Sequence, residues 1–388
     1  MKVLQLCKFF PPFSGGMERV ACELAEGISR HGVGVEVLCA NTQAGTQIDK
    51  GVGGYAITRA GSWGRLLSTS MSPALIAHAR RLSREADLVH VHMPDPMAAL
   101  ALWLARPSAK LVVHWHSDVV RQRVAVQLYR PLQNWLLRRA DAVIATSAAY
   151  AESSPWLRRC RHKTVVIPIG ITDPGCAGVP EAARRIRERF GAKHIVLSLG
   201  RMTYYKGFDV LIDAAADLPD GSVIVVGGDG ELLERHRETV RRKGLSNKIF
   251  FVGHIPHEDL AAYFEAATVF CLASTQRAEA YGVVLLEAMA GAKPVVTTEV
   301  PGSAVSWINQ PGVTGLSVPV GDAKALAGAV NRIAADAAFA DRLGRAARAR
   351  YEQHLSAETM IQSTLNLYRQ LMANTESEAG TVFGNNRS

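Results

Sequence analysis

The sequence lacks paired cysteines, a long apolar run and a signal peptide. Its cysteines are Cys7, Cys22, Cys39, Cys160, Cys176 and Cys271. No two of them form a C-x-x-C pair, which argues against a disulfide framework or a zinc ribbon and indicates a reducing compartment. The longest strongly apolar run, residues 97–105, is half of the ~18 residues that a membrane-spanning helix needs. The first residues lack the basic and apolar regions of a signal peptide, so we expect a soluble, cytoplasmic protein.

The second half of the sequence has no surplus of charge. Residues 1–173 carry 21 Lys and Arg against 12 Asp and Glu, whereas the rest of the 388 residues carry 23 of each kind. The net charge of +9 therefore belongs to the first half, and an anionic partner should bind there. A hydrophobic content of 48% and a charged content of 20% exclude a disordered or coiled-coil chain. The length is enough for two domains.

Short β-branched runs alternate with longer amphipathic stretches along the chain. In the first half we expect strands at 3–7, 33–39, 88–92, 111–116, 142–146 and 164–167, and helices at 17–30, 73–85 and 128–139. In the second half we expect strands at 195–199, 222–226, 249–252, 268–272 and 294–297, and helices at 207–216 and 231–243. The alternation predicts two α/β domains with parallel, doubly wound sheets, joined by a linker within 170–191 and with a cleft between them. Ligands of such sheets bind at the carboxyl ends of the strands.

Two cations follow the first strand of the second half. Arg201 and Lys206 stand between Gly200, which permits a tight exit turn, and Gly207, which opens the next helix. Cations five residues apart can converge on one anion, and the amides of a helix N-terminus favour the same charge. A diphosphate is the natural ligand for such a loop. The alternative is that both side chains are solvated loop charges.

Two carboxylates stand eight residues apart in an apolar stretch. Glu279 lies in a loop after a strand, and Glu287 lies inside an otherwise apolar helix. A carboxylate on a buried helix face is costly unless it is paired or hydrogen-bonded. A sugar or ribose diol, which donates two hydroxyl protons, would satisfy it. The alternative is a core glutamate paired with an arginine or a helix N-terminus.

Weaker signals lie on other loops that follow strands. Gly15-Gly16 follows the first strand without completing G-x-G-x-x-G, which disfavours a dinucleotide site. The two glycines would let backbone amides approach a phosphate or sugar, or would simply form a tight turn. The loops at Gly228-Asp229-Gly230 and at Gly253-His254 could line a nucleotide base.

Two H-x-H pairs occur in the first half, His90 with His92 and His114 with His116. Residues i and i+2 of a strand point the same way, which is metal-ligand spacing, and would suggest a metallohydrolase. However, each pair ends a strand that feeds a different loop, and nothing at typical spacing completes a coordination sphere. We therefore expect no metal site, with His90 and His114 as packing or hydrogen-bonding residues and His116 facing the cleft.

The motifs together are far more specific than any one of them. The set is Gly15-Gly16, Gly200-Arg201, Lys206-Gly207, Glu279 with Glu287, Ala288-Met289-Ala290-Gly291 and Pro294-Val295. In this order, and over the chain to about Arg369, they resemble the retaining family 4 glycosyltransferases. The resemblance implies the GT-B fold, in which two Rossmann-like, doubly wound parallel-sheet domains face a cleft.

The resemblance also implies a domain plan. Residues 1–173 would be the acceptor-binding domain and residues 174–355 the sugar-nucleotide-binding domain. A C-terminal helix over 356–371 would return to the N-terminal domain. Residues 372–388 have little apolar content, which predicts a disordered tail.

Site roles follow from the same resemblance. Arg201 and Lys206 would hold the donor diphosphate, Glu279 would contact the hydroxyls of the donor sugar, and His116 would lie beside the reacting sugar. These are the expected catalytic residues. The remaining donor-binding residues would be Gly15, Gly16, His254, Ala280, Tyr281, Gly282, Val283 and Glu287, with Glu287 on the nucleotide ribose. No metal or other cofactor is implied, in keeping with the absence of a D-x-D pair, because preorganised cations can stabilise the departing diphosphate.

A finer resemblance concerns the donor and the acceptor. The segments that carry it are His114-Trp115-His116-Ser117-Asp118-Val119-Val120-Arg121, Tyr129-Arg130-Pro131-Leu132-Gln133, Ala140-Asp141 and Ser153-Ser154-Pro155. They are similar to bacterial mannosyl- or rhamnosyltransferases of surface polysaccharide assembly, such as that of the O-antigen of lipopolysaccharide. This implies GDP-mannose or GDP-rhamnose as donor and a lipid-linked glycan as acceptor. The alternatives are a UDP- or ADP-sugar enzyme with a soluble acceptor and a non-catalytic binding protein on the same fold.

The basic half suggests a surface for this acceptor. Its clustered cations are Arg80, Arg81, Arg121, Arg123, Arg138, Arg139, Arg158, Arg159, Arg161 and Lys163. Each basic side chain near an anionic leaflet contributes ~1 kcal/mol, so a handful could hold the enzyme on the cytoplasmic membrane face. The alternative is a solvated basic surface. Nucleic acid is a poorer fit, because no binding motif accompanies the charge.

Overall fold

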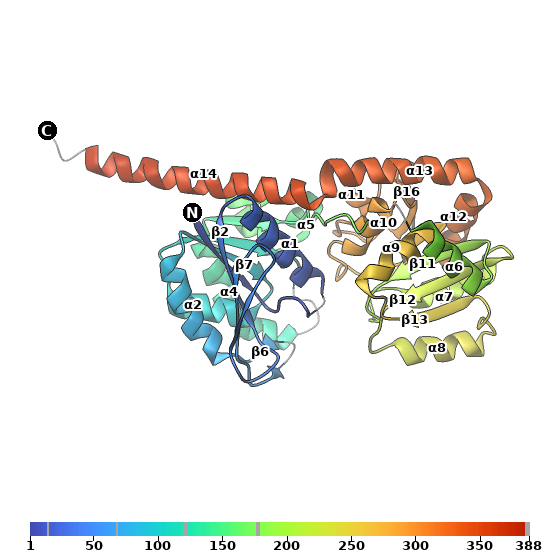
Figure 1. Ribbon diagram of the computed structural model, residues 1–388, viewed down its shortest axis with the longest axis horizontal. Coiled ribbons are helices and arrows are strands. Elements are labelled where there is room, and N and C mark those ends of the chain that lie inside the picture. The colour runs from blue at the N-terminus through green and yellow to red at the C-terminus, as the bar shows by residue number, and fades with distance from the viewer. Residues whose placement is uncertain (14, 67–68, 119–122, 176–178, 385–388) are drawn as a thin grey trace. The chain divides into compact units, whose positions relative to one another are not determined.

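The computed structural model describes residues 1–13, 15–66, 69–118, 123–175 and 179–384 (Figure 1). The chain divides into two compact units. The N-terminal unit holds Met1–Gly170 together with Ala357–Ser388, and the C-terminal unit holds Ile171–Ser356. Both have the parallel α/β architecture that the alternation of elements predicts. No helix in the described part of the chain is long and apolar enough to span a membrane.

An eight-stranded sheet forms the centre of the N-terminal unit, in the order β10-β9-β8-β7-β1-β2-β4-β3. Its strands are β1 (Lys2–Cys7), β2 (Gly34–Ala40), β3 (Gln47–Lys50), β4 (Ala56–Ala60), β7 (Leu88–Met93), β8 (Lys110–Trp115), β9 (Ala142–Ala145) and β10 (Thr164–Val166). Every neighbouring pair is parallel except β3 with β4. Strand β7 is buried along its whole length, as expected for a parallel strand covered on both faces.

Helices cover this sheet, and a short hairpin lies outside it. The helices are α1 (Gly16–Arg30), α2 (Pro73–Glu85), α3 (Pro96–Ala105), α4 (Arg123–Arg139), α5 (Ala148–Ser153), the 3-10 helix η1 (Leu157–Lys163) and α14 (Ala357–Gly384); the hairpin is β5 (Arg65–Leu66) with β6 (Thr69–Ser70). Local sequence explains where α2 begins, since the Ser72 hydroxyl accepts from the Leu75 amide and Pro73 takes the first turn.

Helix α14 packs on α1 within this unit. Gly27 of α1 makes the close approach feasible, because a Cβ there would lie 2.1 Å from Cδ1 of Ile361. The helix continues to Gly384, well beyond the point at which a disordered tail is expected from the composition. No Pro or Gly occurs between Leu371 and Ala379 to end it, and low apolar content alone does not end a helix. Residues 385–388 lie outside the described part of the chain.

The C-terminal unit is built on a six-stranded parallel sheet in the order β13-β12-β11-β14-β15-β16. Its strands are β11 (His194–Leu199), β12 (Ser222–Gly227), β13 (Ile249–Gly253), β14 (Val269–Leu272), β15 (Val295–Thr298) and β16 (Gly315–Val318). Its helices are α6 (Pro180–Phe190), α7 (Phe208–Ala214), η2 (Ala215–Asp217), α8 (Leu233–Arg242), α9 (His257–Ala266), α10 (Val283–Ala290), α11 (Val305–Ile308), α12 (Ala323–Ala335), α13 (Ala337–Arg350) and η3 (Tyr351–Leu355).

One core cluster of this unit lies between the sheet and the helices on one of its faces. Val196, Ile224 and Val269 of three adjoining strands are buried against Leu211 of α7 and Leu326 of α12. Since β11, β12, β13 and β14 are parallel neighbours, the loops that follow them emerge at one edge of the sheet. Those loops carry the motifs that the sequence analysis singles out.

Candidate functional site

Lys206 and Glu279 form a buried ion pair at the carboxyl edge of the C-terminal sheet. The Nζ of Lys206 lies 2.6 Å from Oε2 of Glu279, and the two side chains are 11% and 8% exposed. The Ser274 hydroxyl donates to the same carboxylate oxygen at 2.9 Å. These residues follow two adjoining strands, Lys206 after β11 and Ser274 and Glu279 after β14. Lys206 and Glu279, which belong to separate sequence motifs, are therefore partners in the structure.

The ammonium group of Lys206 keeps donors for a further ligand. A lysine ammonium has three N–H donors, and within the described part of the chain its one hydrogen bond is to Glu279. An anion can therefore bind Lys206 without displacing the carboxylate. Charge-assisted bonds of this kind are stronger than neutral ones, and burial reduces the competition from water.

Glycines let the backbones of these loops approach one another closely. Gly207 has a φ of +68°, and a Cβ there would lie 1.9 Å from the carbonyl oxygen of Ala273. Gly228 after β12 has a φ of +124°, and its Cβ would lie 2.1 Å from the carbonyl oxygen of Gly200. Backbone hydrogen bonds join the same loops, including Thr275 N–H to the Tyr205 carbonyl at 2.8 Å. The loop that carries Lys206 is thus held rigidly against its neighbours.

Arg201 lies on the loop that carries Lys206. Its side chain is exposed, and it makes no hydrogen bond or ion pair with any residue that the structure describes. The loop therefore offers one positive charge held in place and one that is free to meet an incoming anion. His254, on the loop after β13, is likewise exposed at this edge of the sheet.

Helix α10 adds backbone donors to this edge. It begins at Val283 after Gly282, which has a φ of +83°, and no side chain caps it. The first N–H groups of a helix have no partner within the helix, and they favour negative charge. The segment before it is anchored, since the Ser303 hydroxyl donates to the Glu279 carbonyl at 2.5 Å and the Ala304 amide donates to the Ala280 carbonyl at 2.9 Å. Tyr281 is buried beside this turn.

Glu287 lies on the same helix and is 6% exposed. The structure thus confirms that a carboxylate occupies a buried position in an apolar helix, with Leu285, Leu286 and Ala288 buried around it. The binding of a ribose hydroxyl by this carboxylate stays a prediction.

The glycine pair of the N-terminal unit sits at the start of α1. Gly15 is the N-cap with an extended backbone, and no side-chain hydrogen bond caps the helix. A Cβ at Gly15 would lie 2.2 Å from Oε2 of Glu18 in the first turn. Gly15 and Gly16 therefore form the N-terminus of a helix that follows β1, a place where backbone amides can meet a phosphate.

The four histidines of the two H-x-H pairs lie together in the N-terminal unit. His90 and His92 of β7 stack with a ring-centroid distance of 4.7 Å, and His114 and His116 at the end of β8 stack at 4.2 Å. Nε2 of His90 lies 3.2 Å from Nδ1 of His114, which confirms the expectation of hydrogen-bonding residues. The two pairs feed separate loops, as expected from the sequence, but they come together because β7 and β8 are adjoining strands.

Burial keeps these imidazoles neutral. It lowers the pKa of His90 and of His116 to about 3. It also holds the pKa of His92 and of His114 well below the usual range, with a smaller contribution from the neighbouring rings. One nitrogen each of His90, His92 and His114 lies within 4.8 Å of the others, as in a site that could hold a metal ion.

Comparisons with known proteins agree with this arrangement. Residues 14–173 match the family described as Glycosyltransferase Family 4, and residues 180–350 match Glycosyl transferases group 1. The chain is 32% identical over 380 residues to the O-antigen chain mannosyltransferase C of Escherichia coli, and the match covers 96% of this chain and 99% of the relative. It is 34% identical over 363 residues to the D-rhamnosyltransferase WbpZ of Pseudomonas aeruginosa, and the match covers 92% of this chain and 93% of the relative.

Solved structures resemble the chain over almost its whole length. The sucrose-phosphate synthase of Thermosynechococcus elongatus matches with a TM-score of 0.80 and 25% identity, over 96% of this chain and 99% of that one. Anabaena HepE in complex with UDP-glucose matches with a TM-score of 0.76 and 24% identity, over 97% of this chain and 100% of that one, and this likeness concerns the fold alone. The chain therefore belongs to the glycosyltransferases of group 1 and family 4 and is a hexosyltransferase with the GT-B fold.

Proposed function

We propose that the protein transfers mannose or rhamnose from a GDP-linked donor to a growing, lipid-linked glycan of a bacterial surface polysaccharide. The observation that carries the proposal is the buried pair of Lys206 and Glu279 beside the uncapped N-terminus of α10. This arrangement offers a cation and backbone donors for a diphosphate next to a carboxylate that can accept from sugar hydroxyls. The names of the two relatives above support mannose or rhamnose as the sugar.

The reaction breaks the bond between the anomeric carbon of the sugar and the departing phosphate oxygen. The acceptor hydroxyl oxygen forms the new bond to that carbon, and its proton passes to the departing phosphate. Negative charge grows on the diphosphate as it leaves, and Lys206, Arg201 and the first amides of α10 would stabilise it. Glu279 would orient the sugar, and Glu287 would accept from the ribose hydroxyls. Attack from the face that the phosphate leaves would retain the anomeric configuration.

We propose further that the reaction requires no metal or other cofactor. Lys206 and Arg201 supply the positive charge that a divalent cation would otherwise bring to the diphosphate. The sequence also has no D-x-D pair with which to hold such an ion. His254, Gly15 and Gly16 remain proposed contacts of the donor, and His116 remains a proposed neighbour of the reacting sugar.

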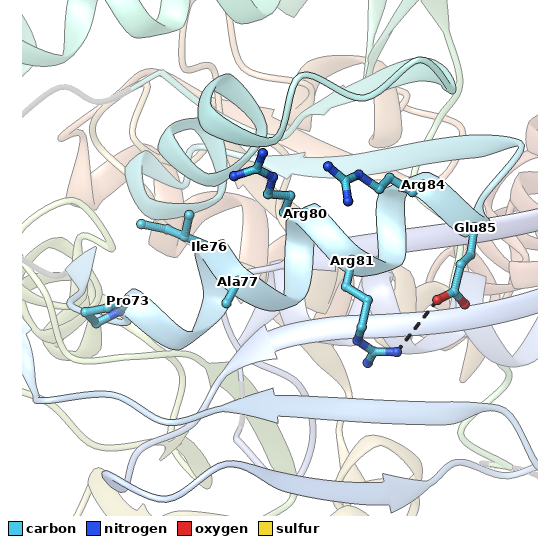
Figure 2. Close-up of a pocket in the computed structure, with 7 residues that line it drawn as sticks. All are labelled: Pro73, Ile76, Ala77, Arg80, Arg81, Arg84 and Glu85. Atoms are coloured by element: carbon cyan, nitrogen blue, oxygen red, sulfur yellow. Dashed lines mark ion pairs between the residues drawn. The ribbon is translucent and has the colours of Figure 1, made fainter.

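For the acceptor, we propose that the N-terminal unit docks on the anionic cytoplasmic face of a membrane. Figure 2 shows Arg80, Arg81 and Arg84 along α2, where they line a shallow pocket with Pro73 and Ile76. All three arginines are exposed, and Arg81 lies 3.8 Å from the Glu85 carboxylate in a solvent-exposed ion pair, which costs little to break.

Other cations of the expected basic surface have structural partners. Arg139 binds Asp141 and the carbonyls of Pro107 and Ala109. Lys163 donates to the carbonyls of Arg138 and Ala140. Arg121 lies outside the described residues, and nothing is described of the Arg123 side chain. Arg158, Arg159 and Arg161 are exposed as well. We propose the surface formed by Arg80, Arg81 and Arg84 on α2, which we call the α2 arginine surface, as the membrane contact, because its three cations line one pocket.

Binding of nucleoside diphosphates tests the donor. The melting temperature of the protein should rise with GDP and rise less with UDP or ADP, because a ligand of the folded state stabilises it. The same measurement on Lys206→Ala should lose most of the GDP effect. A rise with UDP and none with GDP would refute the mannosyl or rhamnosyl assignment. A chelator that abolished sugar transfer would refute the metal-free mechanism.

A further inference from the structure

The four buried histidines form an array on one face of β7 and β8. Each ring of one strand stacks on the other ring of the same strand, and hydrogen bonds cross between the strands. His90, His92 and His114 are completely buried, whereas His116 is 8% exposed, directly after the carboxyl end of β8. The array thus leads from the core of the unit to the edge where ligands of parallel sheets bind.

Tyr368 of α14 closes the buried end of the array. Its hydroxyl is hydrogen-bonded to Nδ1 of His90, and the side chain is completely buried. Burial raises the pKa of Tyr368, so the phenol keeps its proton. A phenol O–H is a strong donor and a neutral imidazole nitrogen is a strong acceptor, so Tyr368 donates to His90.

This direction determines the tautomers of the next two rings. A neutral imidazole carries one N–H donor and one acceptor nitrogen. Because His90 accepts at Nδ1, its proton is on Nε2, and it donates to Nδ1 of His114 at 3.2 Å. His114 then carries its own proton on Nε2. That Nε2 and the Nε2 of His92 are the two ring nitrogens of the array that are buried without a partner in the described structure.

The tautomer of the second pair follows from the unpartnered nitrogen of His92. Nε2 of His92 is buried without a partner in the described structure, and a bare ring nitrogen is the favourable state there because a buried N–H donor without an acceptor is rare. His92 then carries its proton on Nδ1 and donates to Nε2 of His116 at 2.9 Å. His116 accepts at Nε2, and its proton is on Nδ1. That nitrogen makes no hydrogen bond with any residue that the structure describes.

We propose that His92, His114, His90 and Tyr368 form a positioning network for His116, in which the hydrogen bond from His92 fixes its tautomer and the stacked ring of His114 fixes its ring plane. Tyr368 sets the tautomers of His90 and His114 and so holds the supporting ring in place. The network presents Nδ1–H of a neutral His116 at the carboxyl edge of β8, as a donor for a hydroxyl or phosphate oxygen of the substrate. The link to catalysis rests on the proposed function, in which His116 lies beside the reacting sugar.

The same geometry disfavours a metal ion held by His90, His92 and His114. The lone pairs of an imidazole lie in the ring plane, and a tetrahedral ion needs lone pairs that converge on one point. The planes of His90 and His92 are within 14° of parallel, those of His92 and His114 within 24°, and those of His90 and His114 are tilted by 36°. Lone pairs of nearly parallel, stacked rings run side by side, so a bound ion would require new rotamers in a fully packed core.

The tautomer of His116 gives a test that does not depend on sugar transfer. Two-bond 1H–15N correlation spectra of histidine-labelled protein should show His116 protonated on Nδ1. His92→Asn keeps a side-chain amide N–H near the position of Nδ1 and should preserve this state. His92→Leu removes the donor and should abolish the preference. An unchanged His116 tautomer in His92→Leu would overturn the proposal.

Kinetics of the same variants test the consequence for catalysis. His92→Leu should lower kcat on the order of 10²-fold with little change in the KM of the donor, since small misplacements of a reacting group cost about this much. His92→Asn should keep kcat near the wild-type value. Equal losses in both variants would mean packing rather than positioning and would overturn the proposal. A changed tautomer with an unchanged kcat would support the network and instead contradict the place of His116 in the proposed function.

Two further measurements apply if His92→Leu does not fold or if the histidines bind a metal ion. If His92→Leu fails to fold, Tyr368→Phe removes one hydroxyl and keeps the ring, and it should shift the tautomer populations of His90 and His114. Unchanged populations would overturn the proposal. A stoichiometric divalent ion in purified wild-type protein that is lost in His90→Asn would also overturn it.

Discussion

Mild acid should strongly destabilise the N-terminal unit. Burial keeps the pKa of His90 and His116 near 3, and it keeps the pKa of His92 and His114 well below the usual value. In the unfolded chain each histidine titrates near ~6.5. Between these values the unfolded state binds more protons than the folded state, so the free energy of unfolding falls as the pH falls. The loss begins near pH 6.5 and continues toward pH 3.

The expected size follows from the number of rings. Each histidine that stays neutral in the folded state lowers the free energy of unfolding by about 2 kcal/mol between pH 7 and pH 5, and four such histidines lower it by about 8 kcal/mol. A domain of ordinary stability has a total free energy of unfolding of about 5–15 kcal/mol. Acidification to pH 5 should therefore remove most of the stability of this unit. At its steepest, the slope is about 1.4 kcal/mol per pH unit for each ring.

Urea denaturation between pH 7 and pH 5, followed by tryptophan fluorescence, measures this loss. Trp115 is completely buried in β8 between His114 and His116 and reports on the right unit. His92→Asn should reduce the slope by about one proton, which is about 1.4 kcal/mol per pH unit. His162→Asn is the matched control, because the His162 side chain is exposed and should leave the slope unchanged. An uptake of fewer than about two protons when the wild-type protein unfolds in this range would mean that the four rings are not all held neutral in the folded state.

Two further predictions concern the loop of Lys206 and the α2 arginine surface. Gly207→Ala should destabilise the C-terminal unit by more than the ~1–2 kcal/mol that a left-handed alanine costs, because its Cβ would meet the Ala273 carbonyl at 1.9 Å. Gly191→Ala, at a φ of +58° with no atom within 4 Å, is the matched control in urea denaturation, and equal losses would contradict the close approach. Replacement of Arg80, Arg81 and Arg84 by Gln should weaken the binding free energy to anionic vesicles, measured by co-sedimentation, by about 3 kcal/mol, because each charge contributes ~1 kcal/mol. Replacement of the exposed Arg158, Arg159 and Arg161 by Gln should leave this binding unchanged. Binding that persists in high salt would contradict an electrostatic contact.

The periodic apolar runs were sufficient to predict most elements of the fold. The expected helix at 73–85 coincides with α2, and the expected strand at 3–7 lies within β1. Strand β3 was missed because its residues are largely exposed and polar, so it lacks the apolar run of a buried strand. Strand β16 was missed because it has four residues and begins at a glycine, which is a weak strand signal. Patterns of this kind report burial, and they fail where a strand is short or lies at an edge.

The candidate site was predicted as separate residues, and its pairings were not. Lys206 and Glu279 are 73 positions apart, and only the order of strands β11 and β14 brings them together. The same holds for His92 and His116, since the neighbours of a strand cannot be read from its own residues. The partner of Lys163 was also hidden, because backbone carbonyls leave no trace in a sequence. Long-range pairing in a parallel sheet depends on topology, which local patterns do not encode.

Transfer of a radiolabelled hexose from GDP-mannose by Lys206→Ala measures whether Lys206 binds the donor diphosphate. Loss of one preorganised donor to a departing group lowers the rate on the order of 10²–10³-fold. We expect a fall of that size in kcat in a variant that still folds, with a loss of about 3–5 kcal/mol in the free energy of unfolding because Glu279 is left buried without its cation. Lys324→Ala, at an exposed position on α12, should transfer hexose at the wild-type rate. Wild-type transfer by Lys206→Ala would contradict the assignment of the buried Lys206–Glu279 pair as the donor diphosphate site.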